Sequence, residues 1–300
     1  MTRSSTAGGG GLNTPVVLLI FNRPDFTKQV FRVIAEARPK RLFVFADGPR
    51  NAAAAARCTE TRAAIKVDWP CDLTMEVSDV NLGCRERSAT AFDTVFAKSE
   101  TAILLDDDCV PDPTFFRFCE EMLGRYRDDE RVMSITGANY LGSWKGGWRS
   151  PSYHFSQLGS PWGWATWRRA WERFDITMQA WKHPTTKSWL QDVLHNDEIY
   201  QFHARRFDSV DGNGHSWDVA WLFAKLLDRG LTIVPAVNLI RNIGCLGGNS
   251  LPATHPIANM PASAIAFPLR HPRTVVADRR YDLEHVRRIV EGFAVSQVAV

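Results

Sequence analysis

The sequence lacks any apolar run long enough to cross a membrane. Its longest uninterrupted apolar runs, such as Val16 to Phe21, are about six residues long, whereas a membrane helix needs roughly 20. The N-terminal stretch has one basic residue and four glycines but no apolar segment, so it does not resemble a secretory signal. We therefore expect a cytoplasmic protein with no transmembrane segment, in which residues 1–13 are a disordered lead-in.

Paired cysteines and an excess of charge are also missing. None of the six cysteines forms a C-x-x-C pair, which argues against a zinc knuckle or a thioredoxin motif. A chain of 300 residues does not need disulfides, so we expect reduced cysteines. The net charge is only +3, and basic residues are not concentrated in one stretch, which disfavours nucleic acid as a partner.

Strand and helix signals alternate through the first half of the chain. Strands are predicted at Val16–Phe21, Arg41–Ala46, Leu73–Val77, Thr101–Leu105 and Arg131–Thr136, with helices after Asp25 and over 51–66, 88–98 and 113–127. This rhythm predicts an α/β fold with an open, mostly parallel twisted sheet and helices on both faces. In such folds ligands bind beyond the carboxyl ends of the strands.

The second half is less regular. It contains a Gly/Trp-rich segment over 142–167, helices near 186–207 and over 217–229, a turn at Gly212–Gly214, a strand at Leu231–Val234 and a loop over 243–274. No repeat and no Pro/Ser linker is present. We expect a single domain over 14–300, with halves at 14–140 and 141–300.

Three adjacent aspartates, Asp106, Asp107 and Asp108, directly follow a predicted strand. Neighbouring carboxylates repel one another unless a positive charge neutralises them, and a divalent cation with oxygen ligands does this well. A bound Mn²⁺ or Mg²⁺ can also hold a diphosphate. The alternative is a solvated acidic turn that caps the helix starting near Pro113.

The segment Ile103–Phe116, ILLDDDCVPDPTFF, resembles the metal-site strand and turn of nucleotide-sugar glycosyltransferases with the GT-A fold. It is most similar to the N-acetylglucosaminyltransferase I type and to bacterial relatives. Further motifs match in order over roughly 14–256: IFNRP at 20–24, FADG at 45–48, a helix from Arg85 to Phe96 and HSWDVAW at 215–221. The resemblance implies a GT-A-like fold, with the nucleotide sugar held by the first half and the acceptor by the second.

The resemblance also implies roles for single residues. Arg23 would contact the nucleotide diphosphate, Asp47 would read the uracil edge, and Asp218 would be the catalytic base. The residues that the resemblance assigns to nucleotide-sugar binding are Asn22, Arg23, Asp47, Arg87, Asp106, Asp107 and Trp164. Those that it assigns to metal binding are Asp106, Asp108 and His255.

Each of these residues also has a plainer interpretation. Arg23 could be a surface residue of an Asn-Arg-Pro turn, and Asp47 could simply start a turn. Arg87 could belong to a solvated helix start, and His255 could be an exposed loop histidine. Trp164 could pack in the core, although an aromatic face also suits a sugar.

Asp218 is the candidate base on physical grounds as well. Trp217 and Trp221 are four residues apart and share a helix face, so Asp218 lies about 100° away and can face a cleft walled by aromatics. Partial desolvation would make it a better proton acceptor. The alternative is an aspartate favoured by the helix dipole, and Asp175 and Asp211 are rival carboxylates.

The sequence therefore predicts a metal-dependent, inverting glycosyltransferase, either a hexosyltransferase or an N-acetylhexosaminyltransferase. A UDP-sugar is the favoured donor, Mn²⁺ or Mg²⁺ the cofactor, and a glycan or glycoconjugate hydroxyl the acceptor. A glycine-rich lid is expected at Gly244–Gly248, and Arg279 to Arg288 is a candidate for peripheral contact with the inner face of a membrane. The alternatives are a nucleotidyltransferase, disfavoured by the glycine-free FNRP turn, and a non-catalytic carbohydrate-binding protein.

Overall fold

The computed structural model describes residues 11–145, 147, 149–210, 217–247 and 254–298. The expected turn at Gly212–Gly214 lies outside these residues, as does the end of the expected lid at Gly244–Gly248. The expected lead-in is described from residue 11 onward. There Leu12 is buried, and its N–H donates to the carbonyl of Ala37 at 3.3 Å. Residues 11–13 therefore belong to the folded structure.

Within the described residues, eight strands form one sheet in the order β3-β2-β1-β4-β8-β6-β9-β7. The strands are β1 Val16–Ile20, β2 Arg41–Ala46, β3 Asp72–Val77, β4 Thr101–Asp106, β6 Val132–Thr136, β7 Tyr153–Ser156, β8 Trp164–Trp167 and β9 Leu231–Pro235. All run in one direction except β8, which is antiparallel to β4 and β6, and β7, which is antiparallel to β9. The expected α/β fold, with a mostly parallel sheet and helices on both faces, is confirmed.

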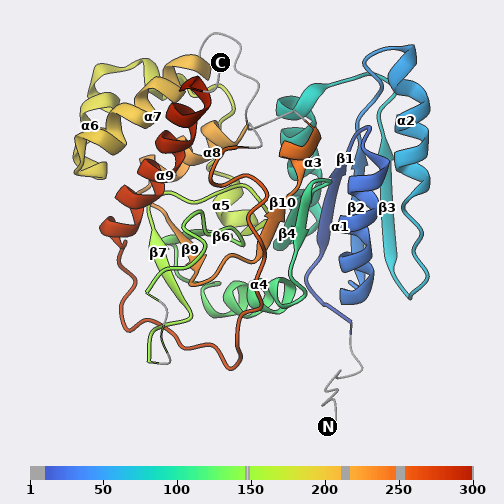
Figure 1. The fold of residues 1–300 in the computed structure, drawn as a ribbon, viewed down its shortest axis with the longest axis horizontal. Helices are drawn as coiled ribbons and strands as arrows, with labels where there is room; N and C mark the ends of the chain where they lie inside the picture. Colours follow the sequence, from blue (N-terminus) through green and yellow to red (C-terminus); the bar gives the residue numbers. More distant parts are fainter. Residues whose placement is uncertain (1–10, 146, 148, 211–216, 248–253, 299–300) are drawn as a thin grey trace.

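Helices cover both faces of this sheet because strand side chains alternate between the faces. Val16 and Leu18 of β1 pack with α1 (Pro24–Ala37) and α4 (Thr114–Arg125), whereas Val17 packs with α3 (Gly83–Lys98) and α8 (Trp217–Leu227). Figure 1 shows α1 and α2 (Ala52–Ala63) beside β1 to β3, at the end of the sheet far from β7. Each fully buried valine or leucine of these layers contributes about 1.5–3 kcal/mol.

The remaining helices gather beside the second half of the sheet. They are α5 (Arg168–Trp171), α6 (Pro184–Leu194), α7 (Asp197–Val210), α9 (Arg279–Val298) and the 3₁₀ helix η1 (Gln179–Lys182). The single helix expected near 186–207 is divided in two. His195 ends α6 in the left-handed region at φ 50°, and the Asn196 side chain accepts a hydrogen bond from the N–H of Ile199 at 3.0 Å. The sequence gives both signals, a residue tolerant of positive φ and a capping asparagine.

The helix α9 includes the segment expected to touch a membrane. Its Tyr281 and Val286 are fully buried in the protein, and Figure 1 shows α9 lying beside α7 and α8. These apolar side chains are therefore covered by the chain itself, which counts against that expectation. Among the described helices, none combines the length and apolar character that a membrane crossing requires.

The Gly/Trp-rich segment contains strands that the sequence did not predict. The short strand β8 lies between β4 and β6, so the segment completes the centre of the sheet. Gly163 precedes β8 with φ 57°, and an added Cβ there would lie 2.4 Å from Ile240. A second, two-stranded sheet pairs β5 (Cys109–Pro111) with β10 (Ile240–Asn242) and carries the chain away from the acidic triplet.

Candidate active site

The end of β4 directs neighbouring aspartates to opposite faces of the sheet. Leu104 packs in the layer of α3 and α8, and Leu105 packs in the layer of α1 and α4. By the same alternation Asp106 belongs to the α8 side and Asp107 to the α1 side. Asp107 is buried, with 1% of its surface exposed, whereas Asp106 is half-buried. Asp106 therefore lies on the face from which Asp218 also projects.

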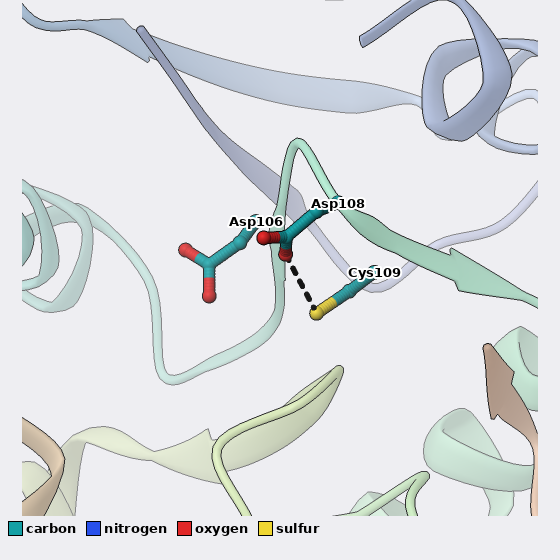
Figure 2. A group of neighbouring side chains, drawn as sticks. All are labelled: Asp106, Asp108 and Cys109. Carbon is teal, nitrogen blue, oxygen red and sulfur yellow. Dashed lines mark hydrogen bonds between the residues drawn. The ribbon is translucent and has the colours of Figure 1, made fainter. Parts of the chain in front are cut away.

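Two of the three aspartates share a potential metal site with a cysteine. One ligand atom from each of Asp106, Asp108 and Cys109 lies within 4.8 Å of the others, and Figure 2 shows the three side chains around the turn that follows β4. Carboxylate oxygens are the ligands that Mg²⁺ and Mn²⁺ prefer. The DXD-like spacing of Asp106 and Asp108 therefore brings suitable donors together.

The thiol of Cys109 orients Asp108 and is not itself suited to bind these metals. Its Sγ donates to Oδ1 of Asp108 at 3.4 Å. Burial raises the pKa of the Cys109 thiol well above its usual range, and sulfur is a ligand of softer metals than Mg²⁺ or Mn²⁺. Asn242 supports the same oxygen with an Nδ2 donor at 3.5 Å. Gly244 lies so close that an added Cβ would be 2.3 Å from Oδ2 of Asp108.

The negative charge of this group exceeds what the protein neutralises. Burial, together with the charges of Asp108 and Asp107, raises the pKa of Asp106 to about 8. Asp218 contributes in the same direction, which means that its carboxylate acts on Asp106 through space. A divalent cation would relieve this repulsion, so the residues present fit a metal ion.

Arg23 occupies the other side of the triplet. It precedes α1, and its two terminal nitrogens pair with Asp107 and, at 2.8 Å, with Oδ2 of Asp108. Asp107 also accepts a hydrogen bond from the N–H of Phe21 at 3.4 Å. Burial raises the pKa of Asp107 to about 6, although Arg23 acts in the opposite direction. The guanidinium expected to bind a diphosphate is thus engaged with the carboxylates in this structure.

Asp218 lies in the first turn of α8, as the sequence predicts. Trp217 and Trp221 are buried in the aromatic cluster beneath it, and Trp164 of β8 stacks on Trp217 with ring centroids 5.3 Å apart. The Asp218 carboxylate lines a cavity of about 420 Å³ together with Trp164 and Trp221. Arg206 of α7 donates to it at 3.3 Å. The expected aromatic cleft beside Asp218 is therefore present.

Asp47 stands at the end of β2, at the expected edge of the sheet, but its carboxylate holds a loop. Its Oδ1 accepts hydrogen bonds from the N–H groups of Gly48 and Leu82, both at 2.9 Å. Its Oδ2 accepts from the Asn81 amide at 2.9 Å and from the N–H of Gly83 at 3.0 Å. Four donors match the acceptor capacity of a carboxylate. Recognition of a base edge by Asp47 stays a prediction, and this geometry counts against it.

Arg87 and Asn22 differ in their contacts within the protein. Arg87 is buried over the ring of Phe45, where its Nη1 pairs with Glu76 at 2.7 Å and its Nη2 donates to the carbonyl of Glu76 at 2.9 Å. This side chain clamps α3 to the sheet, which counts against its expected contact with the nucleotide. Asn22 is half-buried beside Arg23, and its carbonyl accepts a hydrogen bond from Arg57 at 3.0 Å.

His255 is not among the clustered ligand atoms, so its role as a metal ligand stays a prediction that the geometry counts against. Its ring is buried against α9, where Nε2 lies 3.1 Å from the carbonyl of Ile289 and Nδ1 accepts from the N–H of Ile257 at 3.3 Å. Both ring nitrogens are thus engaged by backbone groups. Among the residues that the structure describes, the clustered ligand atoms belong to Asp106, Asp108 and Cys109.

Sequence reasoning missed several side chains around the two aspartates. Asn242 reaches Asp108 from β10, and Arg206 reaches Asp218 from α7. Each is distant in sequence from its partner and belongs to no motif, so only tertiary packing brings it there. Cys109 stands directly beside the triplet, and this adjacency was the one signal available.

No protein-family model matches this sequence, and no curated protein matches it either. Among solved structures, the chain is similar to S. aureus TarS, with a TM-score of 0.37, 13% identity and coverage of 55% of this chain and 30% of TarS. It is also similar to the mannosyltransferase PcManGT from Pyrobaculum calidifontis, solved with GDP-Man and Mn²⁺. That TM-score is 0.36, at 14% identity over 82% of this chain and 78% of the other. The role of each residue is therefore inferred from this chain alone.

Proposed function

We propose that this chain is a metal-dependent glycosyltransferase that moves a sugar from a nucleotide-diphosphate donor to a hydroxyl group of a glycan or glycoconjugate. One observation carries the proposal: the ligand atoms of Asp106 and Asp108 lie within 4.8 Å of one another, at the edge of the sheet whose adjoining face is covered by α8 with its half-buried Asp218. A metal site beside a candidate base matches the requirements of sugar transfer from a diphosphate.

Asp106 and Asp108 would hold the metal ion, Mn²⁺ or Mg²⁺. When bound, the ion supplies positive charge that offsets the charge developing on the departing nucleotide. Arg23 keeps Asp108 in position through its 2.8 Å contact and adds a second positive charge at the same edge. A guanidinium there can also turn one of its N–H groups toward a phosphate oxygen.

Asp218 would accept the proton of the acceptor hydroxyl. The hydroxyl oxygen then forms a bond to the anomeric carbon while the bond from that carbon to the diphosphate breaks, so the configuration inverts and the nucleoside diphosphate leaves. Arg206 supplies a positive charge beside the Asp218 carboxylate, and the aromatic walls exclude water from it. UDP is the donor nucleotide that we propose, on the sequence resemblance.

The proposal is tested with Asp218→Asn. We expect a loss of transfer by about 10²- to 10⁴-fold, the usual contribution of a general base, with little change in donor binding. Transfer and hydrolysis are measured with Mn²⁺ across UDP-, GDP- and CMP-sugars, and donor binding is measured by calorimetry. Asp175→Asn is the matched control, because Asp175 is the exposed rival carboxylate and its side chain only holds Thr177.

Equal activity of Asp218→Asn and wild type would contradict the assignment of the base. Absence of turnover with every nucleotide sugar, in a protein that still binds glycans, would instead favour a carbohydrate-binding protein. Transfer from a GDP- or CMP-sugar alone would keep the reaction class and overturn the UDP preference.

A further inference from the structure

The two outermost strands of the sheet, β7 and β3, differ in what lies against their free sides. Beside β7 the chain adds a further contact, because Ala277 bridges to Phe155 and the N–H of Asp278 donates to the Phe155 carbonyl at 2.7 Å. Among the described residues, no strand or bridge pairs with the free side of β3, which Figure 1 shows at the end of the sheet beside α2. An open outer strand presents unpaired N–H and C=O groups that can bind a further strand.

The hydrogen bonds between β2 and β3 show which residues carry these unpaired groups. The N–H of Asp72 donates to the carbonyl of Lys40 at 2.8 Å, so the backbone of Asp72 is directed toward β2. Successive residues of a strand direct their backbone groups to opposite sides in turn. Leu73, Met75 and Val77 therefore direct theirs away from the sheet, toward the free side of β3.

The same three residues have apolar side chains that are partly exposed. Leu73, Met75 and Val77 are 40%, 37% and 42% exposed, whereas their neighbours Leu42 and Val44 on β2 are fully buried. Outer strands are usually protected by lysine, proline or a bulge. The sequence of β3, DLTMEV, has no lysine or proline, and its register with β2 is continuous. Backbone and side chains of β3 thus both fit a further strand.

A second copy of β3 is complementary to the first. In an antiparallel pair centred on Met75, Leu73 faces Val77 of the second copy, and Met75 faces Met75. All three residues have free backbone groups, so each facing pair can exchange two hydrogen bonds. Thr74 then faces Glu76, which keeps the carboxylates from facing each other. The arrangement is a closed two-fold dimer, which leaves no free side of β3 for a third copy.

The helix α2 enlarges the contact. Two six-residue strands alone bury less than the roughly 1,200–2,000 Å² of a stable interface. The helix packs against α1 and lies beside β3, and its first turns expose the short side chains of Ala52, Ala53 and Ala56. The two-fold axis brings the same sheet face of both copies to the same side, so each α2 approaches the α2 of the other copy.

We propose that β3 is a dimerisation strand, through which two copies of this chain pair in antiparallel and join their sheets into one. Because the copies run in opposite directions, the two acidic triplets lie at opposite ends of the joined sheet, and neither covers the other. The inference does not depend on the proposed reaction.

The first test measures the oligomeric state of the full chain by analytical ultracentrifugation at roughly 1–100 μM. We expect a dimer of the wild type. Met75→Lys places two ammonium groups opposite each other at the two-fold axis, so we expect dimer affinity to fall by about 100-fold or more. Val290→Lys is the matched control, because Val290 is an apolar residue of α9 with the same exposure, 42%, as Val77. Circular dichroism checks that both variants are folded.

The second test measures the register by cross-linking under a mild oxidant. Facing residues of a hydrogen-bonded antiparallel pair have Cα atoms about 5.5 Å apart, within the roughly 4.4–6.8 Å that a disulfide spans. Met75→Cys should therefore form a covalent dimer. Leu73→Cys should not do so alone, but it should cross-link to Val77→Cys when the two variants are mixed. Wild type oxidised in parallel is the control for the native cysteines.

Four results would overturn the inference. They are a wild type that stays monomeric throughout, assemblies larger than a dimer, equal dimerisation of Met75→Lys and Val290→Lys, and equal cross-linking of Leu73→Cys and Met75→Cys. A dimer that is lost in Met75→Lys, retained in Val290→Lys and trapped by Met75→Cys supports the pairing of β3 with its copy.

Discussion

The edge of the sheet at β4 and the region around α8 differ in how far their polar groups are satisfied. At the edge, charged side chains pair with one another, as Arg23 does with Asp107 and Asp108. Around α8, the buried ring nitrogens of Trp221 and His203 have no partner among the described residues. The edge thus holds paired charges, whereas the region around α8 also contains neutral polar atoms that are unpaired among the described residues.

This contrast sets the size of the expected effects. Removing a carboxylate from a metal site changes the charge that the cation meets, whereas removing one neutral donor changes a single hydrogen bond. Variants at the edge should therefore have larger consequences than variants of neutral groups around α8. They should also depend on divalent metal, which variants of those neutral groups should not.

The largest effect is expected from Asp108→Asn, which removes one of the two metal carboxylates while keeping its shape. Loss of even an indirect contact to a metal lowers affinity by 10- to 100-fold, so we expect Mn²⁺ affinity to fall by about 100-fold or more. Calorimetric titration with Mn²⁺ measures this. Asp79→Asn, an exposed aspartate of the same half, is the control and should bind Mn²⁺ normally. Equal Mn²⁺ affinity in the two variants would contradict a metal site at this edge of the sheet.

A smaller effect is expected from Arg23→Ala. Breaking a buried ion pair costs 3–5 kcal/mol, and because the Arg23 side chain is 23% exposed we expect a loss of roughly 2–3 kcal/mol in the free energy of unfolding. Mn²⁺ should then raise the Tm of this variant more than that of the wild type, since the ion replaces the lost charge. Thermal unfolding with and without Mn²⁺ gives both values.

Arg50→Ala is the control for this variant, because Arg50 is exposed and lies over the ring of Phe21. It should leave the metal-induced shift in Tm unchanged. An equal metal-induced shift in Tm in the Arg23 and Arg50 variants would show that Arg23 and the metal ion do not bind the same carboxylates.

The last effect is spread over several pH units and concerns the helix α9. Asp282 of α9 is buried against Ser156 and Gln157, and burial raises its pKa from 3.8 to about 7. Between those pH values the folded chain binds a proton that the unfolded chain has lost. The stability from this group is complete below about pH 4 and falls by about 1.4 kcal/mol per pH unit until about pH 7.

Asp282→Asn should remove that slope. Urea unfolding at several pH values between 4 and 7 measures the difference from wild type, and Glu284→Gln, an exposed change on the same helix, should retain the wild-type slope. If the free energies of unfolding of Asp282→Asn and wild type differ by the same amount at every pH in this range, a buried, protonated Asp282 is contradicted.

Local patterns were sufficient to predict the sheet edge. The apolar run of β4 followed by three aspartates predicted both the strand and the charged turn, and Trp217 and Trp221 predicted the buried face of α8. These features depend on neighbours within a few residues, where strand and helix periodicity act. The fold class followed from the alternation of strands and helices.

Features that depend on distant partners were not predictable. The strand β8 has four residues, too few for a period, and only pairing with β4 and β6 defines it. Asp47 follows a strand as Asp106 does, but the loop at Asn81 supplies donors that turn its carboxylate inward. His255 similarly meets backbone groups of α9. The sequence therefore locates a polar residue at a strand end or in a loop. Its role depends on the hydrogen-bond partner that it meets in the folded structure.

The most direct test of the central claim is nucleotide binding as a function of metal. UDP and GDP are titrated into wild type and Asp106→Asn by calorimetry, with Mn²⁺ and with a chelator. We expect wild type to bind a nucleotide diphosphate only when Mn²⁺ is present, and Asp106→Asn not to bind it under either condition. Binding that is equally tight with the chelator, or that persists in Asp106→Asn, would contradict a metal site at the end of β4.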